Sequence, residues 1–219
     1  MAVVPNYKQR LSFQRIILKW FLKNQRHYPW RKQSNPYMIL VAEIMLQKTN
    51  SGKVTTIYTE FTGKYPDIRT LAASNLGDIE NALIPLGLKY RASRLKKISE
   101  EIIKKHNFEI PSLSQDLMAL PGIGQYIANA ILCFGHGKKV PIVDVNVIRL
   151  YKRVFGIISE KKRPRDDPAF WDFAEKMLPK AHFKEYNMAL LDLSSLICQI
   201  TVTKCHNCPA SGVCISHSI

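Results

Sequence analysis

A glycine-bearing turn between two helical segments constrains this chain most. Residues 120–144 read LPGIGQYIANAILCFGHGKKVPIVD, and the turn PGIG opens directly into a helical pattern. Gly122 and Gly124 let the backbone turn sharply, so the first amides of the next helix can point at an anion. A PGxG turn is also a common plain connection between helices. Asp144, further along, is either a functional carboxylate or only the N-cap of the following helix.

The net charge indicates which anion to expect. The chain has 32 Lys and Arg against 17 Asp and Glu, a formal charge of +15 and an isoelectric point near 9.7. Such a balance favours a polyanion, and DNA phosphate is the natural one, bound in a salt-dependent way. The cation runs 89–97 and 161–165 are then phosphate contacts, or else solvated faces.

A membrane surface is the other partner that this charge could serve. No apolar run approaches the roughly eighteen to twenty residues of a spanning helix, and the N-terminal residues lack the apolar core of a signal peptide. We therefore expect no membrane partner and no targeting signal. The expected protein is a monomer in the cytoplasm, associated with the nucleoid.

Helical periodicity dominates the chain, and alternating strand patterns are scarce. Short connections rich in Pro, Gly, Asn and Ser separate the helical segments. We expect helices at 8–25, 36–48, 51–64, 75–83, 88–106, 112–119, 125–135, 144–156, 168–178 and 182–197. Residues 140–143 could form a short strand. The predicted fold class is all-α.

Four cysteines near the C-terminus have the spacing C-x6-C-x2-C-x5-C. They are Cys198, Cys205, Cys208 and Cys214. In an intracellular protein this pattern indicates metal rather than disulfides. Zinc sites usually pair their ligands as two short knuckles, whereas the longer outer spacings here favour a [4Fe-4S] cluster, with zinc as the alternative.

The hairpin, the downstream aspartate and the four-cysteine loop, in this order, resemble the helix-hairpin-helix (HhH-GPD) DNA glycosylases. That superfamily includes endonuclease III, the A/G-specific adenine glycosylases and the thymine/uracil mismatch glycosylases. The resemblance runs from about Arg26 to Cys214, and the cysteine spacing is similar to the family's [4Fe-4S] signature. It implies a six-helix barrel with the hairpin at 27–141 and a helical iron–sulfur domain made of 1–26 and 142–219. Double-stranded DNA with a mismatched or damaged base would lie in the cleft between them.

The resemblance implies a catalytic role for Asp144. Base excision needs a nucleotide flipped out of the stack, and then an anion near C1′ that stabilises an oxocarbenium-like sugar and helps water attack. Asp144 in IVDVNVIRL matches the family's catalytic aspartate. The hairpin residues that would grip the DNA backbone are Gly122, Ile123, Gly124 and Gln125.

Tyr126 indicates the subclass of chemistry. Members that also cleave the backbone through a Schiff base carry a lysine at this position, and a phenol cannot form an imine with C1′. The sequence therefore predicts a monofunctional hydrolase that leaves an abasic site. The plain structural alternative is a tyrosine ring packed in the hairpin helix with its hydroxyl hydrogen-bonded.

Glu43 is the only charge in the otherwise apolar segment 37–47. Burial would favour its protonated form and raise its pKa, as suits a general acid that protonates a departing base. A structural carboxylate paired with an arginine is the alternative. The segment VAEIMLQKT is similar to the one in which adenine glycosylases keep their base-protonating glutamate.

Residues around Glu43 and the 86–90 loop indicate how DNA strands are separated. Gln47 and Lys48 are placed to enter the gap left by the flipped base, and Lys89 and Tyr90 could wedge from the opposite side. The alternative is that these are ordinary solvated loop residues.

The excised base is the least determined feature. Residues 46–49 read LQKT and 86–90 read LGLKY, whereas adenine glycosylases favour LQQT and GLGYY. The RHYPWR and NPYMIL segments look more like the thymine/uracil mismatch enzymes. We therefore predict excision of thymine or uracil opposite guanine, with adenine opposite 8-oxoguanine or guanine as the alternative. A non-catalytic DNA-binding protein is a remote third reading, against which Asp144, Glu43 and Tyr126 together argue.

Overall fold

The computed structural model describes residues 5–87 and 89–217, and this part of the chain is helical. It contains no strand, only an isolated antiparallel bridge between Cys198 and Thr203. The predicted all-α fold is confirmed, whereas residues 140–143 adopt no regular structure. None of the described helices is long and apolar enough to span a membrane. Leu88, where one expected helix began, lies outside the described residues, as do 1–4 and 218–219 of the predicted cluster domain.

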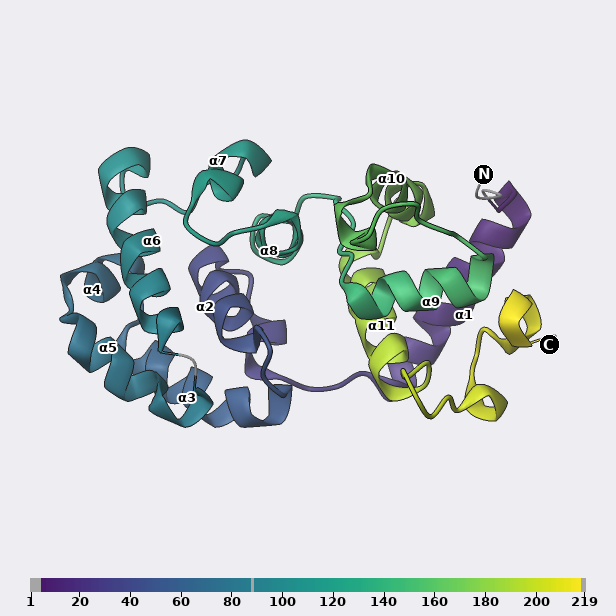
Figure 1. Ribbon diagram of the computed structural model, residues 1–219, viewed down its shortest axis with the longest axis horizontal. Coiled ribbons are helices and arrows are strands. Elements are labelled where there is room, and N and C mark those ends of the chain that lie inside the picture. Colours follow the sequence, from purple (N-terminus) through teal and green to yellow (C-terminus); the bar gives the residue numbers. More distant parts are fainter. Residues whose placement is uncertain (1–4, 88, 218–219) are drawn as a thin grey trace. The chain divides into compact units, whose positions relative to one another are not determined.

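The described chain divides into two compact units, which can be followed by colour in Figure 1. One is His27–Lys138, and the other combines the described parts of Met1–Arg26 and Lys139–Ile219. The assignment of these units as a six-helix barrel and an iron–sulfur domain stays a prediction.

The His27–Lys138 unit is built around α2, of whose eleven residues eight are buried. Helix α2 contacts α3 and the π-helical turn η3, while α6 packs against α4 and α5. Its α-helices are α2 (Pro36–Leu46), α3 (Ser51–Lys64), α4 (Ile68–Ala73), α5 (Leu76–Leu83), α6 (Tyr90–His106), α7 (Ser114–Ala119) and α8 (Gln125–Ala130). Short turns complete it: η1 (Pro29–Lys32), η2 (Ile84–Leu86) and η3 (Ile131–Gly135). An apolar helix of this kind is buried on nearly all faces because it is the core.

Two local features differ from the sequence expectation. Helix α4 was missed because it has only six residues and follows Pro66-Asp67, which has the composition of a turn. Asp67 is instead its N-cap and accepts the Thr70 amide at 2.8 Å. The expected helix at 125–135 changes at Ile131 from α to π geometry. There Gly135 packs so closely that a Cβ would lie 2.7 Å from Pro36 Cα, so only glycine fits.

The other unit packs α11 (Phe183–Leu196) against α1 (Tyr7–Asn24) and α9 (Val145–Phe155). Aromatic rings fill its centre, with ring centroids 4.9 Å apart for Phe13 and Phe155 and 5.1 Å apart for Tyr151 and Phe173. The remaining elements are η4 (Pro164–Asp166), α10 (Pro168–Met177), η5 (Cys205–Asn207), η6 (Ser211–Val213) and η7 (Ile215–His217). The unit thus joins the first helix of the chain to the last helices.

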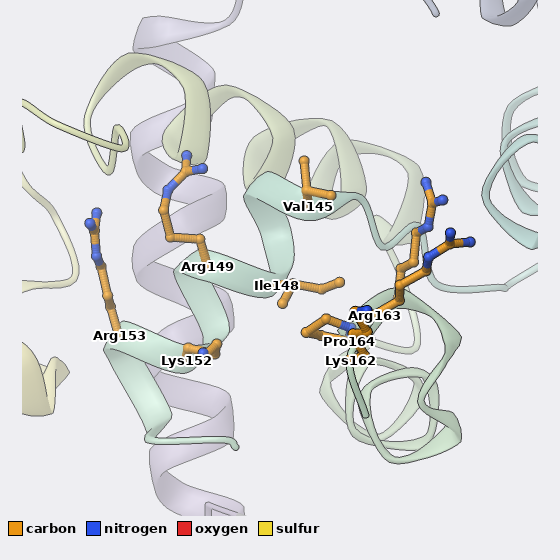
Figure 2. Close-up of a pocket in the computed structure, with 9 residues that line it drawn as sticks. Val145, Ile148, Arg149, Lys152, Arg153, Lys162, Arg163 and Pro164 are labelled. Atoms are coloured by element: carbon orange, nitrogen blue, oxygen red, sulfur yellow. The ribbon is translucent and has the colours of Figure 1, made fainter. Parts of the chain in front are cut away.

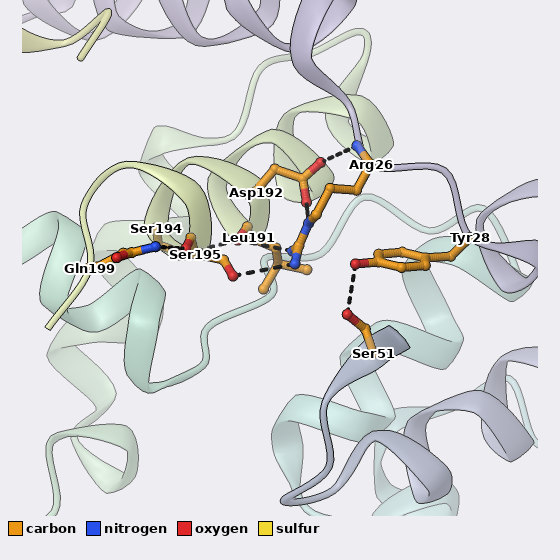
Figure 3. Close-up of polar contacts among 8 residues, drawn as sticks. All are labelled: Arg26, Tyr28, Ser51, Leu191, Asp192, Ser194, Ser195 and Gln199. Atoms are coloured by element: carbon orange, nitrogen blue, oxygen red, sulfur yellow. Dashed lines mark hydrogen bonds and ion pairs between the residues drawn. The ribbon is translucent and has the colours of Figure 1, made fainter. Parts of the chain in front are cut away.

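A buried ion pair fixes the end of the N-terminal segment to α11 (Figure 3). Asp192 is fully buried, and its carboxylate accepts hydrogen bonds from Arg26 Nε at 2.6 Å and from the Arg26 backbone amide at 3.0 Å. The guanidinium also donates to Ser195 Oγ at 3.3 Å. A buried carboxylate is tolerated only with such partners, so this pairing specifies where the chain leaves α1.

Candidate active site

Asp144 is the N-cap of α9, and its half-buried carboxylate is held in one orientation. Oδ1 accepts the backbone amides of Asn146 at 2.9 Å and Val147 at 2.7 Å, and Oδ2 accepts Asn146 Nδ2 at 2.7 Å. These bonds place the charge at the positive end of the helix dipole. The capping role weighed from the sequence is therefore present, and it also fixes a carboxylate that solvent can reach.

The hairpin joins α7 to α8 through residues 120–124, and Gly124 is the N-cap of α8. Gly122 adopts a left-handed φ of 73°, which glycine accepts without strain. Gly122, Gly124 and Gln125 are exposed, whereas Ile123 is buried. The turn therefore presents backbone to solvent while Ile123 anchors it, an arrangement that suits contact with an anion. Tyr126 follows on α8 and is half-buried.

Arg94 connects three segments that the sequence had marked separately. Its Nη1 donates to Gln47 Oε1 at 2.7 Å, and its guanidinium lies over the Tyr90 ring at 4.9 Å. It also fills the space beside Gly122, where a Cβ would lie 2.4 Å from Arg94 Nε. The hairpin, the loop after α2 and the start of α6 therefore meet at one arginine. This role is not readable from the sequence, because Arg94 stands in a run of cations.

Arg91 holds the loop after α2 from the protein interior. Its side chain is fully buried, and Nη2 donates to the Gln47 carbonyl and to Thr49 Oγ1. The expectation that the run 89–97 is a phosphate-contacting or solvated face is therefore wrong for Arg91. Lys48, between these anchors, is exposed in a left-handed conformation with φ of 54°. The loop thus presents Lys48 outward on a fixed backbone.

Glu43 lies in α2 and is only 7% exposed, as the apolar pattern predicted. Helix α2 contacts α8, which carries Tyr126. Lys89 and Tyr90 are exposed at the start of α6. The structure thus places Glu43, Tyr126 and the predicted DNA-contacting residues in the His27–Lys138 unit, and Asp144 with the four cysteines in the other unit.

The four cysteines are half-buried in the loops after α11. Burial raises the pKa of the Cys208 thiol above its usual value, and the nearby thiols of Cys198, Cys214 and Cys205 raise it further. Among the described residues, however, no group of three or more His, Cys, Asp or Glu side chains is arranged to hold a metal ion.

Two arginines of α9 hold the first part of this cysteine loop. Arg149 Nε donates to the Cys198 carbonyl at 3.0 Å, and Arg153 Nη1 donates to the Gln199 carbonyl at 2.6 Å. Arg153 Nη1 also lies 3.5 Å from Cys198 Sγ. Four cysteine sulfurs are a donor set that binds zinc or iron as thiolates. The donor set therefore fits a thiolate-bound group, although the sulfurs do not converge on one ion.

A comparison with known protein families finds a match over much of the chain. The model of the HhH-GPD superfamily base excision DNA repair proteins matches residues 41–172. The chain belongs to the HhH-GPD superfamily. The matched region includes Glu43, Tyr126 and Asp144 and ends before the cysteines. The resemblance drawn from the hairpin, the aspartate and the cysteine loop is thereby confirmed.

Individual relatives within the HhH-GPD superfamily cover the chain almost completely. The thymine/uracil-DNA glycosylase of Pyrobaculum aerophilum is 38% identical over an alignment of 218 residues that covers 97% of this chain and 95% of the relative. The solved structure of a thermostable thymine-DNA glycosylase matches with a TM-score of 0.91 at 32% identity, covering 96% of this chain and 97% of that one. The adenine DNA glycosylase of Buchnera aphidicola subsp. Baizongia pistaciae is 34% identical over 94% of this chain, but the match covers only 59% of that protein.

Substitutions of the two hairpin glycines of this HhH-GPD protein test the packing of Arg94 against Gly122. Gly122→Ala forces a side chain into the left-handed region and against Arg94, so we expect it to lower the free energy of unfolding by about 2–3 kcal/mol. Gly124 has a φ of −97° and open space where its Cβ would be. We expect Gly124→Ala, the matched control, to cost less than about 1 kcal/mol in urea unfolding.

A double variant separates the two causes. In Arg94→Ala with Gly122→Ala the side-chain clash is gone and only the backbone strain is left, so the added cost of Gly122→Ala should shrink. An equal cost of Gly122→Ala with and without Arg94, or a cost no larger than that of Gly124→Ala, would contradict the close packing of Arg94 on the turn.

Proposed function

We propose that this chain is a monofunctional DNA glycosylase of base excision repair. It flips thymine or uracil paired with guanine out of duplex DNA and hydrolyses the glycosidic bond, leaving an abasic site. The observation that carries the proposal is the fixed, half-exposed carboxylate of Asp144 at the start of α9, in a chain of this superfamily. The thymine/uracil-DNA glycosylase of Pyrobaculum aerophilum and the thymine-DNA glycosylase structure support the choice of base.

Asp144 acts on the sugar. As the base departs, positive charge develops on the ring, and a carboxylate held beside C1′ stabilises it and orients the attacking water. The three hydrogen bonds that Asp144 accepts keep its carboxylate from turning away. Such preorganisation is worth more than the same charge on a freely rotating side chain, because no reorientation is needed during the reaction.

Tyr126 limits the chemistry to hydrolysis. Backbone cleavage in this family proceeds through an amine that attacks C1′ and forms an imine. At position 126 the chain offers a phenol, so the reaction stops at the abasic site. Tyr126 is half-buried on α8 and follows Gln125, the last of the proposed phosphate contacts, in the sequence.

Glu43 acts on the leaving base. Glu43 is 7% exposed in α2, and its carboxyl is proposed to donate a proton to the base. Protonation of the base lowers the barrier to its departure. The Asp144 carboxylate then stabilises the positive charge that develops on the sugar. The two carboxyls thus have separate tasks, set by burial for Glu43 and by helix amides for Asp144.

The DNA-contacting residues divide into backbone and stack contacts. The hairpin amides of the exposed residues Gly122, Gly124 and Gln125 bind a phosphate. Lys48 and Gln47 occupy the place of the flipped nucleotide, and Lys89 and Tyr90 wedge against the stack. The hydrogen bonds from Arg91 and Arg94 to Gln47 support this assignment. A loop that inserts between bases must be rigid, because unstacking the bases costs free energy.

The four cysteines are proposed to hold a [4Fe-4S] cluster. A single tetrahedral zinc ion requires four sulfurs about 3.8 Å apart, given a Zn–S distance of about 2.3 Å. Among the described residues no such group is arranged, and the spacing C-x6-C-x2-C-x5-C supports a cluster over the two short knuckles that are usual for zinc. With all four positions filled by cysteine, the cluster would stabilise a terminal segment of short turns rather than take part in catalysis.

An excision assay tests the proposed function. We expect the protein to release the base from G·T and G·U duplexes, so that alkali then breaks the strand. Duplexes with A·8-oxoguanine and A·G pairs serve as the matched comparison for the adenine alternative. Faster excision from the adenine duplexes would reassign the substrate, and no strand break with any of the four would exclude a glycosylase. Borohydride should not trap a covalent complex, since Tyr126 replaces the attacking amine.

Metal analysis tests the cluster. We expect purified protein to be brown, with a visible thiolate-to-iron absorption band and about four irons per chain. Cys205→Ser should lose the band, while Cys133→Ala, which removes the one cysteine outside the cluster motif, should keep it. A colourless protein with stoichiometric zinc would overturn the proposal.

A further inference from the structure

A basic groove of about 560 Å³ lies between α9 and the loop that contains η4 (Figure 2). Six cations line it: Arg149, Lys152, Arg153, Lys162, Arg163 and Arg165. Val145, Ile148 and Pro164 supply its apolar surface, and none of the described residues lining it is acidic. The proposed catalytic roles leave this groove unused, although it begins at the residue directly after Asp144.

Five of the six cations fall into two groups. Arg149 and Arg153 are occupied with the cysteine loop, where they donate to the carbonyls of Cys198, Ser194 and Gln199 at 2.6–3.0 Å. Figure 2 shows both side chains extending away from Pro164. They therefore form the wall of the groove rather than free donors.

Lys152, Lys162 and Arg163 form the second group. All three are exposed, and none of their side chains has a hydrogen bond or ion pair with another described residue. Arg165 belongs to neither group, because its Nε forms a long ion pair, at 3.8 Å, with the exposed carboxylate of Asp166. Three like charges without partners around one groove repel one another, so they favour an anion between them.

The loop that carries Lys162 and Arg163 is held from both ends. Ser159 Oγ donates to Asp167 Oδ2 at 2.5 Å, and the buried Trp171 ring donates from Nε1 to the Arg165 carbonyl at 2.9 Å. The carboxylate of Asp167 also caps α10, so it is directed at Ser159 and Ala169. The cations are thus presented on a fixed backbone, which reduces the entropy lost on binding.

We propose that this groove binds the sugar-phosphate backbone of one DNA strand beside the target nucleotide. Lys152, Lys162 and Arg163 contact phosphates, and the exposed Val145 side chain packs against deoxyribose. Lys152 is eight residues beyond Asp144, about 12 Å along the helix axis. This equals three to four nucleotide steps of about 3.4 Å, so the contacted phosphates lie outside the flipped nucleotide. The inference rests on the proposed glycosylase function.

The salt dependence of DNA binding tests the groove. The triple variant Lys152→Gln, Lys162→Gln, Arg163→Gln should reduce the slope of log affinity against log salt by about 2–3, since each lost phosphate contact removes about 0.9. Affinity at about 0.1 M salt should fall by about one to two orders of magnitude, equally for mismatched and matched duplexes. Fluorescence anisotropy over a salt series measures both.

A control of equal charge makes the test specific. Lys8→Gln, Lys19→Gln, Lys23→Gln removes three exposed lysines from α1 of the same unit. We expect it to change the slope by less than one contact, and thermal melts should show both triple variants folded. A groove variant with the wild-type slope, or a control that lowers the slope equally, would overturn the proposal.

Free ATP distinguishes a second source of phosphate. Stoichiometric ATP binding that the groove variant abolishes, with an unchanged DNA slope, would assign the groove to a free nucleotide and overturn the DNA contact. The wild-type excision assay separates this result from failure of the proposed function. Salt slopes can be measured even on a protein that releases no base.

Discussion

The hydrogen bonds that the α9 amides donate to Asp144 are the interaction on which the proposed chemistry depends. They hold the carboxylate at the positive end of the helix, and the buried face of α9, from Val147 to Val154, holds the helix in its unit. Further along, Arg149 and Arg153 bind the carbonyls of the cysteine loop. One amphipathic helix therefore carries the carboxylate, one wall of the basic groove and the anchor of the C-terminal loop.

In the other unit the corresponding constraint is the packing around the hairpin. Arg94 fills the space that Gly122 leaves and holds Gln47, while Arg91 holds the backbone of the same loop. The residues proposed to touch DNA are thus mounted on buried or half-buried arginines. This explains why a strongly basic chain need not use every cation for phosphate. Some of its positive charge is structural.

The sequence was most informative where local patterns decide the structure. All ten expected helical segments contain a helix, because their apolar periodicity and caps are local signals. Gly122 and the N-cap role of Asp144 were also readable, since turn and cap chemistry depend on adjacent residues. Helix α4 was lost because six residues give too little periodicity, and Asp67 resembles a turn residue as much as a cap.

The interactions between distant residues were not readable. Arg91 lies among four other cations in the run 89–97, and its contacts with Gln47 and Thr49, 44 and 42 positions away, explain its burial. Arg26 and Asp192 are 166 positions apart, and no local pattern pairs them. The groove similarly depends on α9 meeting the loop before α10. Residue types could indicate a DNA-binding surface, but the division of its cations into structural and free ones needed the tertiary contacts.

The most direct test of the account is single-turnover excision from a G·U duplex by Asp144→Asn. Asparagine is an equally good N-cap, so the thermal melt and the affinity for DNA should stay near those of the wild type. The loss of the negative charge should lower the rate of base release by about two to four orders of magnitude. A variant that melts normally, binds DNA and releases uracil at the wild-type rate would contradict the central role of Asp144.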